Sequence, residues 1–301
     1  MSMLKDNVNM GPSQLRRLIK KSFVVAPGVF DGISAILAQQ AGFKALYLSG
    51  SAVAGKDGLP DLSVTTLSEV AQEARNITAV SRLPLIVDVD TGFGEAINVI
   101  RTIRVMEATG AAGIHMEDQE LPKKCGQLSG KKLVSEEEMV RKVRAAVETR
   151  KNDDFLIIAR TDARAVEGLE GAIDRGNAYV EAGADMVFPE ALESAGEFET
   201  FAKKVRAPLL ANMTEFGKSP LMSGKELGEI GYKIIIFPLT GFRSSLLAMK
   251  NTYSLLNKYG TQREFLDSLM TRDEFYKVIG YSSYEKEDLE LYKGKASKRK
   301  P

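Results

Sequence analysis

Short apolar runs recur along the whole chain, and each is followed by a longer stretch whose apolar residues have helical spacing. This alternation predicts repeated units of one strand followed by one helix. The runs predict strands over residues 23–31, 45–50, 83–90, 113–118, 155–162, 185–190, 208–213 and 233–239. Most runs are apolar until their last one or two positions, which is typical of a parallel sheet that is covered on both faces.

Helices are predicted between these strands. They cover residues 65–80, 95–109, 135–151, 168–182 and 195–205. Ser135, with Glu138 in the third position after it, has the capping-box pattern at the start of one helix. Gly110, Gly183 and Gly231 are placed to end the helices that precede them.

Eight strand–helix units predict an α/β fold, a (β/α)8 barrel of the TIM type. A doubly wound open sheet is the alternative, but no glycine-rich nucleotide loop follows the first apolar run. We expect the catalytic barrel to occupy residues 1–260. Residues 261–301 are predicted to form a C-terminal helical extension with a basic, frayed tail. Residues 261–290 are too apolar for a disordered segment, so we expect them to pack on the chain's own barrel or on a neighbouring subunit.

Composition excludes several classes of function. The 41 Lys and Arg residues nearly balance the 40 Asp and Glu residues, so nucleic acid and membranes are not expected partners. One cysteine cannot form an internal disulfide, and the N-terminus lacks the apolar run of a secretory signal. No stretch approaches the roughly 20 apolar residues that span a bilayer. We therefore predict a cytoplasmic protein that acts on a small molecule.

Acidic residues follow two neighbouring predicted strands. Asp88 and Asp90 stand two positions apart in VDVD, so in a strand their side chains point the same way, and Glu117 ends the next run. Strand ends converge on one face of a barrel, where three carboxylates would repel each other without a cation. We predict a Mg²⁺ site, with Mn²⁺ as an alternative metal. The alternative role for these carboxylates is helix capping or pairing with Arg160.

Other strand ends carry groups that bind anions. Arg160 can hold a substrate carboxylate bidentately or pair with Glu190. A carboxylate nest is predicted from Ser49, Gly50 and Ser51, and further site lining from Asn212 and Thr214. His115 is expected to be a barrel-interior residue.

Cys125 lies in the loop of residues 119–134, which is long for a strand-to-helix connection and is therefore a candidate lid. Lys123 and Lys124 precede the cysteine, and their positive potential is expected to stabilise a thiolate. The flanking glycines would let the loop close over an anion. An incidental thiol in a surface loop is the alternative.

Several motifs together resemble one family. They are LYLSGS, GLPDL, VDVDTGFG, MEDQ, KKCGQ, ARTDA, FPEA and ANMTEFG. The set resembles the isocitrate lyase/phosphoenolpyruvate mutase superfamily and, within it, the 2-methylisocitrate lyases. The likeness runs from about residue 12 to about residue 285.

The resemblance implies a barrel whose final helix is exchanged between subunits of a homotetramer, a dimer of dimers. It implies that Asp88 binds Mg²⁺ directly, and that Asp61, Asp90 and Glu117 hold metal-bound waters. The substrate-binding residues it implies are Ser49, Gly50, Ser51, Gly126, Gln127, Arg160, Glu190, Asn212, Thr214 and Arg243.

The implied reaction is cleavage of the tricarboxylate 2-methylisocitrate to pyruvate and succinate in the methylcitrate cycle of propionate catabolism. Cys125 would be the general acid, and either Tyr47 or Asp61 the general base. Gln127 departs from the histidine that is common in these lyases, and it cannot relay a proton. Isocitrate lyase activity and oxaloacetate decarboxylase activity are alternatives on the same barrel. A non-catalytic barrel that binds dicarboxylates is a further alternative, which Cys125 and the acidic set argue against.

Overall fold

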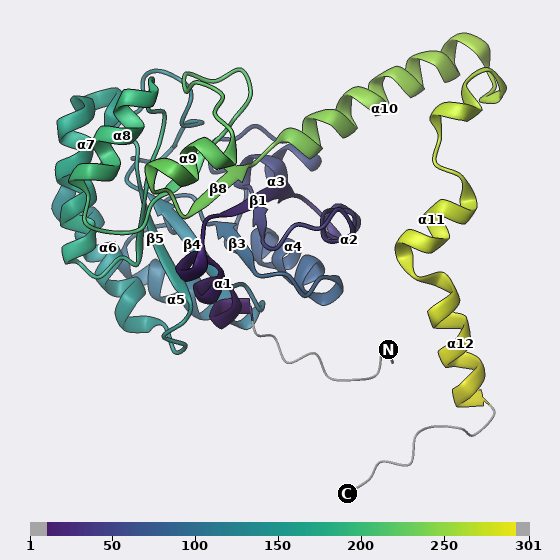
Figure 1. Cartoon of the computed structure of the whole chain (residues 1–301), viewed down its shortest axis with the longest axis horizontal. Helices are drawn as coiled ribbons and strands as arrows, with labels where there is room; N and C mark the ends of the chain where they lie inside the picture. The colour runs from purple at the N-terminus through teal and green to yellow at the C-terminus, as the bar shows by residue number, and fades with distance from the viewer. Residues whose placement is uncertain (1–10, 293–301) are drawn as a thin grey trace, which may run out of the picture. The chain divides into compact units, whose positions relative to one another are not determined.

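The computed structural model describes residues 11–292, and within them parallel strands form a barrel (Figure 1). The strands are β1 (Val24–Val29), β2 (Leu46–Leu48), β3 (Leu85–Asp88), β4 (Gly113–Glu117), β5 (Leu156–Thr161), β6 (Met186–Pro189), β7 (Leu210–Asn212) and β8 (Ile234–Phe237). They pair in the order β6-β5-β4-β3-β2-β1-β8-β7. A parallel bridge between Val187 and Leu209 joins the two ends of this order. The predicted (β/α)8 fold is therefore confirmed.

Helices surround the strands and alternate with them along the chain (Figure 1). They are α1 (Gly11–Lys21), α2 (Gly32–Gln40), α3 (Gly50–Lys56), α4 (Leu67–Val80), α5 (Ala96–Ala108), α6 (Glu136–Thr149), α7 (Arg164–Glu181), α8 (Ala195–Lys204) and α9 (Gly224–Ile230). Gly110, Gly183 and Gly231 follow α5, α7 and α9 with φ angles of 83°, 103° and 120°. Only glycine adopts this backbone readily, so the three predicted helix ends are confirmed.

Two details of the helices differ from the prediction. α7 begins at Arg164, upstream of the helix predicted from residue 168, but Gly168 (φ 83°, ψ −178°) is not helical and divides it, so a short first stretch precedes Gly168 and the predicted helix follows it. Ser135 does cap α6, since its Oγ accepts a hydrogen bond of 3.2 Å from the Glu138 amide. The capping box is nevertheless incomplete. The Glu138 carboxylate instead lies 3.4 Å from Nζ of Lys142, one turn further along the helix.

The apolar core has an inner and an outer part. Tyr47, Ile86, Ile158 and Phe188 belong to the cluster that fills the barrel interior. Two further clusters lie between the strands and the outer helices. This two-sided burial explains why the strands are apolar along most of their length. The buried apolar part of each strand stops at its carboxyl end, where the polar residues begin.

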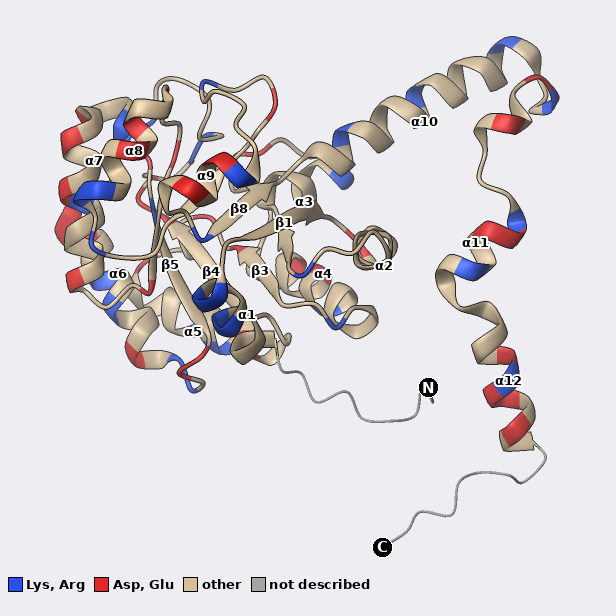
Figure 2. Cartoon of the chain, in the orientation of Figure 1, with Lys and Arg blue, Asp and Glu red and all other residues tan. Residues whose placement is uncertain are grey.

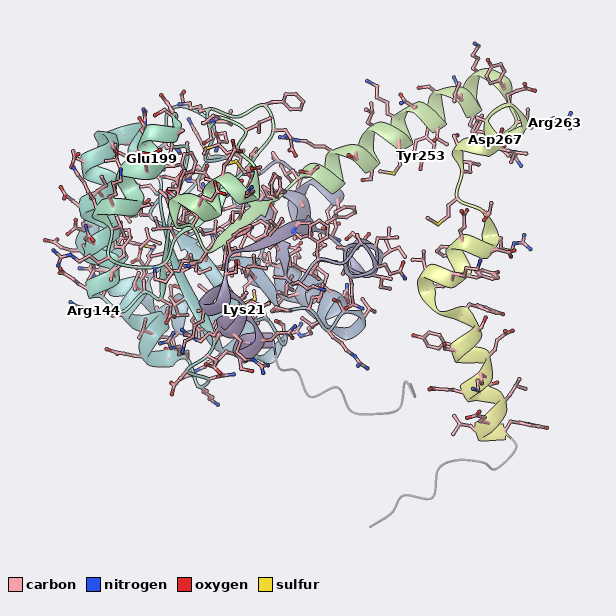
Figure 3. All side chains as sticks on the ribbon, in the orientation of Figure 1. Lys21, Arg144, Glu199, Tyr253, Arg263 and Asp267 are labelled. Carbon is pink, nitrogen blue, oxygen red and sulfur yellow. The ribbon has the colours of Figure 1, made fainter. Side chains whose placement is uncertain are left out.

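Charged residues of both signs lie mainly on the outer helices and the loops (Figure 2). Arg144 on α6 and Glu199 on α8 are exposed examples (Figure 3). No helix among residues 11–292 is long and apolar enough to cross a membrane.

The chain divides into two compact units between Ser244 and Ser245, within α10 (Thr240–Tyr259) and upstream of the boundary predicted at residue 260. The C-terminal unit continues with the 3-10 helix η1 (Arg263–Ser268), α11 (Arg272–Ile279) and α12 (Tyr281–Tyr292), so its predicted helical character is confirmed. Its exposed apolar side chains include Tyr253, which is labelled in Figure 3. Exchange of this segment between subunits stays a prediction. The predicted basic tail, residues 293–301, lies outside the described residues.

Candidate active site

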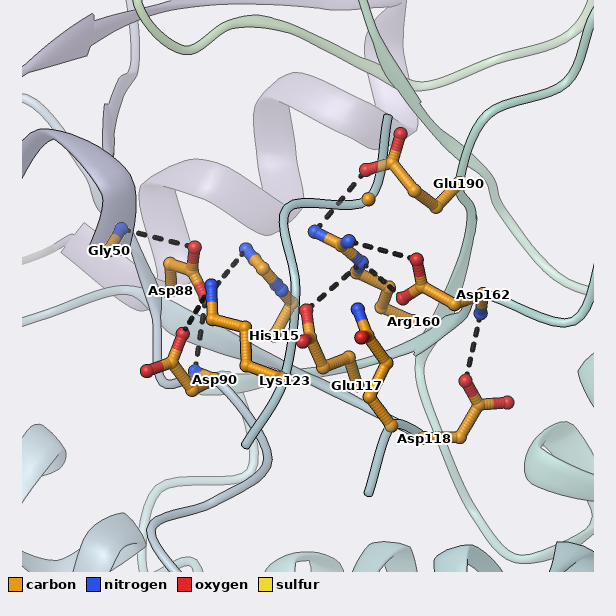
Figure 4. Close-up of polar contacts among 12 residues, drawn as sticks. Gly50, Asp88, Asp90, His115, Glu117, Asp118, Lys123, Arg160, Asp162 and Glu190 are labelled. Carbon is orange, nitrogen blue, oxygen red and sulfur yellow. Dashed lines mark hydrogen bonds and ion pairs between the residues drawn. The ribbon is translucent and has the colours of Figure 1, made fainter. Parts of the chain in front are cut away.

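The candidate site lies at the carboxyl ends of the strands, where side chains distant in sequence become neighbours (Figure 4). Asp88 ends β3 and is held by two backbone amides. Its Oδ2 accepts a 3.1 Å hydrogen bond from Gly50 N, and its Oδ1 accepts one of 3.0 Å from Asp90 N. The carboxylate therefore has a fixed orientation before any ligand binds.

The predicted nest Ser49-Gly50-Ser51 connects β2 directly to α3. Ser49 is buried and precedes the helix, while Gly50 and Ser51 form its first two positions. A Cβ on Gly50 would lie 3.2 Å from Asp88 Oδ2 and 3.3 Å from Asp90 Oδ1. These contacts are tight, so the Gly50 backbone packs directly against both carboxylates.

Asp90 and Glu117 have buried carboxylate oxygens whose close contacts are ion pairs rather than hydrogen bonds. Among the described residues, Asp90 Oδ1 and both carboxylate oxygens of Glu117 are buried without a hydrogen bond. Their neutralising partners are cations: Lys123 Nζ lies 3.0 Å from Asp90 Oδ1, and Arg160 Nε lies 3.2 Å from Glu117 Oε2. Burial raises the pKa of Glu117 well above its usual range, with Arg160 opposing that effect.

The three predicted metal ligands do not converge on one point. No three His, Cys, Asp or Glu side chains between residues 11 and 292 form a group that could hold a metal ion. Lys123 occupies part of this space, since its ammonium also contacts Asp61 closely. The residues are compatible with Mg²⁺, because that ion needs few direct protein ligands and keeps several waters. The orphaned oxygens of Asp90 and Glu117 are suited to accept hydrogen bonds from such waters.

Arg160 is the centre of the anionic cluster (Figure 4). Its Nε and Nη2 donate to Asp162 Oδ2 and Oδ1 at 2.9 and 3.1 Å. Its Nη1 lies 3.3 Å from Glu190 Oε2, so the structural ion pair predicted as one possibility is present. The guanidinium carbon also lies 5.1 Å from the centre of the Phe188 ring. Arg160 is thus rigidly held at the mouth of the barrel.

Glu190 joins the lid, residues 119–134, to the seventh strand. It accepts a hydrogen bond from Gln127 Nε2 of the lid and one of 3.2 Å from Asn212 Nδ2. Asn212 Oδ1 in turn accepts a 2.8 Å hydrogen bond from Thr214 Oγ1. The structure therefore brings four of the predicted binding residues into one network.

Gln127 also reaches the loop that follows β7. Its Oε1 accepts a 2.8 Å hydrogen bond from Lys218 N. Arg243, the last predicted binding residue, lies in the same region but pairs with Glu215. Its Nη1 donates to Glu215 O at 2.7 Å and lies 3.0 Å from Glu215 Oε2. Arg243 makes no hydrogen bond or ion pair to Asn212 or Thr214 within the described residues.

Tyr47, one of the two candidate bases, lies inside the barrel. Its hydroxyl and His115 Nε2 share a 2.7 Å hydrogen bond. Burial, and then the neighbouring Asp88 carboxylate, raise the pKa of Tyr47 well above its usual range. Burial lowers the pKa of His115 to about 4, so this ring is neutral near pH 7. His115 is fully buried, as the sequence predicted.

Burial raises the pKa of the Cys125 thiol, which favours the protonated form over the predicted thiolate. A hydrogen bond from the Gln127 backbone and the charge of Arg160 lower this pKa, whereas Asp61 and Glu190 raise it further. The expected activation by Lys123 fails because that ammonium is paired with Asp61 and Asp90. A thiol that keeps its proton is suited to act as an acid.

Gly126 brings the lid backbone directly onto the cluster. A Cβ at this position would lie 2.3 Å from Arg160 Nη2 and 2.4 Å from Glu190 Cγ. Gly126→Ala should therefore prevent full closure and lower kcat/KM by about 100-fold, the scale of effect known for small misplacements of catalytic groups. Steady-state kinetics would test this, with Ser129→Ala in the same lid as the control. A Gly126→Ala enzyme of wild-type kcat/KM would contradict the prediction.

Comparison with known proteins identifies the family of this chain. The family model described as phosphoenolpyruvate phosphomutase matches residues 15–256. The chain belongs to this family. A protein of Aeropyrum pernix named 2-methylisocitrate lyase is 57% identical over 278 residues, which cover 92% of this chain and 90% of that protein.

Solved structures of the family have the same fold. The structure of 2,3-dimethylmalate lyase matches with a TM-score of 0.89 and 38% identity, covering 93% of this chain and 95% of the other. A complex of phosphonopyruvate hydrolase with oxalate and Mg²⁺ matches with a TM-score of 0.83 and 30% identity, covering 94% and 99%.

Sequence reasoning assigned no role to two members of the cluster: Asp162, which it placed only among the polar strand ends, and Lys131, which it did not name. Asp162 stands two positions after Arg160, directly beyond the end of β5, and could have been identified as its partner from that spacing. Lys131 gives no such signal, because lysines in polar loops are usually solvated.

Proposed function

We propose that this enzyme cleaves 2-methylisocitrate to pyruvate and succinate. The observation that carries the proposal is the position of Cys125, beside a glycine that packs onto Arg160 and Glu190. A protonated thiol delivered by a lid is suited to protonate a carbanion released by carbon–carbon cleavage. The identity of 57% to a protein named 2-methylisocitrate lyase supports the choice of substrate.

We propose a Mg²⁺ site on Asp88, with Asp61, Asp90 and Glu117 holding metal-bound waters. The buried oxygens of Asp90 and Glu117 that make no hydrogen bond support this assignment, most clearly Glu117 Oε1, which has no ion-pair contact either. When bound, the metal would lower the pKa of the substrate hydroxyl and polarise the adjacent carboxylate. Lys123 would then have to leave its contacts with Asp61 and Asp90.

The remaining predicted residues are proposed to hold the two ends of the substrate. The pyruvyl half would lie between Arg160 and the nest of Ser49, Gly50 and Ser51. The set proposed for the lid side and the succinyl end comprises Gly126, Gln127, Glu190, Asn212, Thr214 and Arg243. The network from Gln127 through Glu190 to Asn212 supports this arrangement.

The reaction conserves protons. A base takes the proton of the substrate hydroxyl, the bond to the neighbouring carbon breaks to give pyruvate, and Cys125 donates its proton to the carbon that leaves. Tyr47 and Asp61 both remain candidates for the base. Lid closure would exclude water, which would otherwise compete as a proton source.

We further propose a homotetramer in which the C-terminal unit contacts another subunit. The exposed apolar side chains of that unit, among them Leu266, Met270 and Phe275, support such an interface. The cytoplasmic location predicted from the sequence stays a prediction.

The proposed function is tested by the 2-oxo acid that each substrate releases with Mg²⁺: pyruvate from 2-methylisocitrate and oxaloacetate, and glyoxylate from isocitrate. We expect kcat/KM for 2-methylisocitrate to exceed that for isocitrate by about 10-fold or more, the typical contribution of one methyl group. EDTA should abolish the reaction. Preferred turnover of oxaloacetate would refute the proposal.

A further inference from the structure

Lys131 lies near the end of the lid, and its charge is buried. The side chain has no exposed area, and neither has that of its partner Asp162. Its ammonium donates to the carbonyl oxygen of Gly126 and, at 2.7 Å, to Asp162 Oδ1. A lysine is almost never fully buried unless it is paired, and Asp162 is its partner here. Because Asp162 follows β5 of the barrel, the contact requires the lid to fold against the barrel.

Asp162 connects the lysine to the centre of the site. The Asp162 carboxylate also accepts the two hydrogen bonds from Arg160. The backbone amide of Asp162 donates to Asp118 Oδ1 at 2.8 Å. Lys131 therefore fixes the backbone of Gly126 to the group that holds Arg160. The residue before Gly126 is Cys125.

Lys123 and Gln127 of the lid also make polar contacts with the barrel, but their partners belong to the proposed ligand sites. Lys123 contacts Asp61 and Asp90, which are proposed to serve the metal. Gln127 contacts Glu190, which is proposed to serve the substrate. A bound ligand competes for both of these contacts, whereas Asp162 is assigned to neither ligand.

We propose that Lys131 is the positioning residue that sets the closed lid in register with Arg160 and thereby places the Cys125 thiol. It acts through the Gly126 carbonyl and Asp162 and touches no reacting atom. The catalytic consequence rests on the proposed function of Cys125 as an acid, while the effect on lid position does not depend on it.

Cys125 is the sole cysteine of the chain, so its alkylation rate measures how far the lid is released from the barrel. Lys131→Met keeps the length and apolar bulk of the side chain but removes the ammonium. We expect the rate of Cys125 alkylation by iodoacetamide at pH 7.5 to rise about 10-fold, because release of the lid exposes the thiol and reverses the effect of burial on its pKa. Lys132→Met, at the exposed neighbouring position, should react at the wild-type rate.

Kinetics separate positioning from simple stabilisation. For Lys131→Met we expect kcat for 2-methylisocitrate to fall about 100-fold while KM changes less than threefold, with the melting temperature within a few degrees of wild type. Should the methionine variant fail to fold, Lys131→Gln gives the same two readouts.

An unchanged alkylation rate in a folded Lys131 variant would overturn the proposal, and so would an equal rise in Lys132→Met. If the wild-type enzyme does not cleave 2-methylisocitrate, the proposed function fails. The alkylation rates would still decide the role of Lys131.

Discussion

Replacing Cys125 with serine should lower kcat for 2-methylisocitrate by about 1000-fold and leave magnesium affinity unchanged. The thiol keeps its proton at neutral pH because burial raises its pKa, yet it remains far more acidic than a serine hydroxyl. General acids typically contribute 10²–10⁴-fold to a rate. Steady-state kinetics and calorimetric titration with Mg²⁺ would measure the two effects.

Ser129→Ala, an exposed position in the same lid, is the control for this variant and should retain wild-type turnover. A Cys125→Ser enzyme with more than about a tenth of wild-type kcat would contradict the assignment, because a general acid contributes more than that.

The same assignment predicts the sign of the pH dependence. A donor must be protonated, so activity should be present below the pKa of Cys125 and lost as the pH rises through it. Since that pKa is raised, the alkaline limb of kcat should lie above the usual thiol value of about 8.5. The residual activity of Cys125→Ser should lack this limb.

Asp88→Asn should lower magnesium affinity at least about 100-fold and reduce activity below about 1% of wild type, since losing a charged metal ligand removes most of the binding energy. Two backbone amides donate to the Asp88 carboxylate. In asparagine, the amide nitrogen would face one of these donors, so the variant loses both the charge and the fixed orientation. Calorimetric titration and kinetics across a range of Mg²⁺ concentrations would check this.

Asp267→Asn provides the matched change of charge at an exposed residue of the C-terminal unit (Figure 3). It should bind magnesium as the wild type does. Wild-type magnesium affinity in Asp88→Asn would mean that the metal, if it binds, has other ligands.

The sequence predicted the strands because burial on both faces leaves a clear apolar signal. The run 155–162, for example, contains β5 (Leu156–Thr161), and its polar end contains Arg160. The helix containing Gly168 was harder to predict, because a glycine can start a helix or interrupt one. Local pattern does not separate these two cases.

Charge pairing explains what the sequence could not predict about the site. The expected thiolate at Cys125 assumed that Lys123 was free, but Asp61 and Asp90 neutralise that ammonium in the folded lid. The burial of Lys131 likewise depends on Asp162, a residue on a distant strand. Such pairs are created by tertiary structure and leave no trace in sequence spacing.

The most direct test of the central claim, carbon–carbon cleavage followed by protonation of the released carbon, is NMR analysis of the products formed from 2-methylisocitrate in D₂O. The account predicts pyruvate and succinate in equal amounts, with one deuterium in each succinate, because an exchangeable proton is delivered to the released carbon. Absence of succinate, or succinate without deuterium, would contradict it.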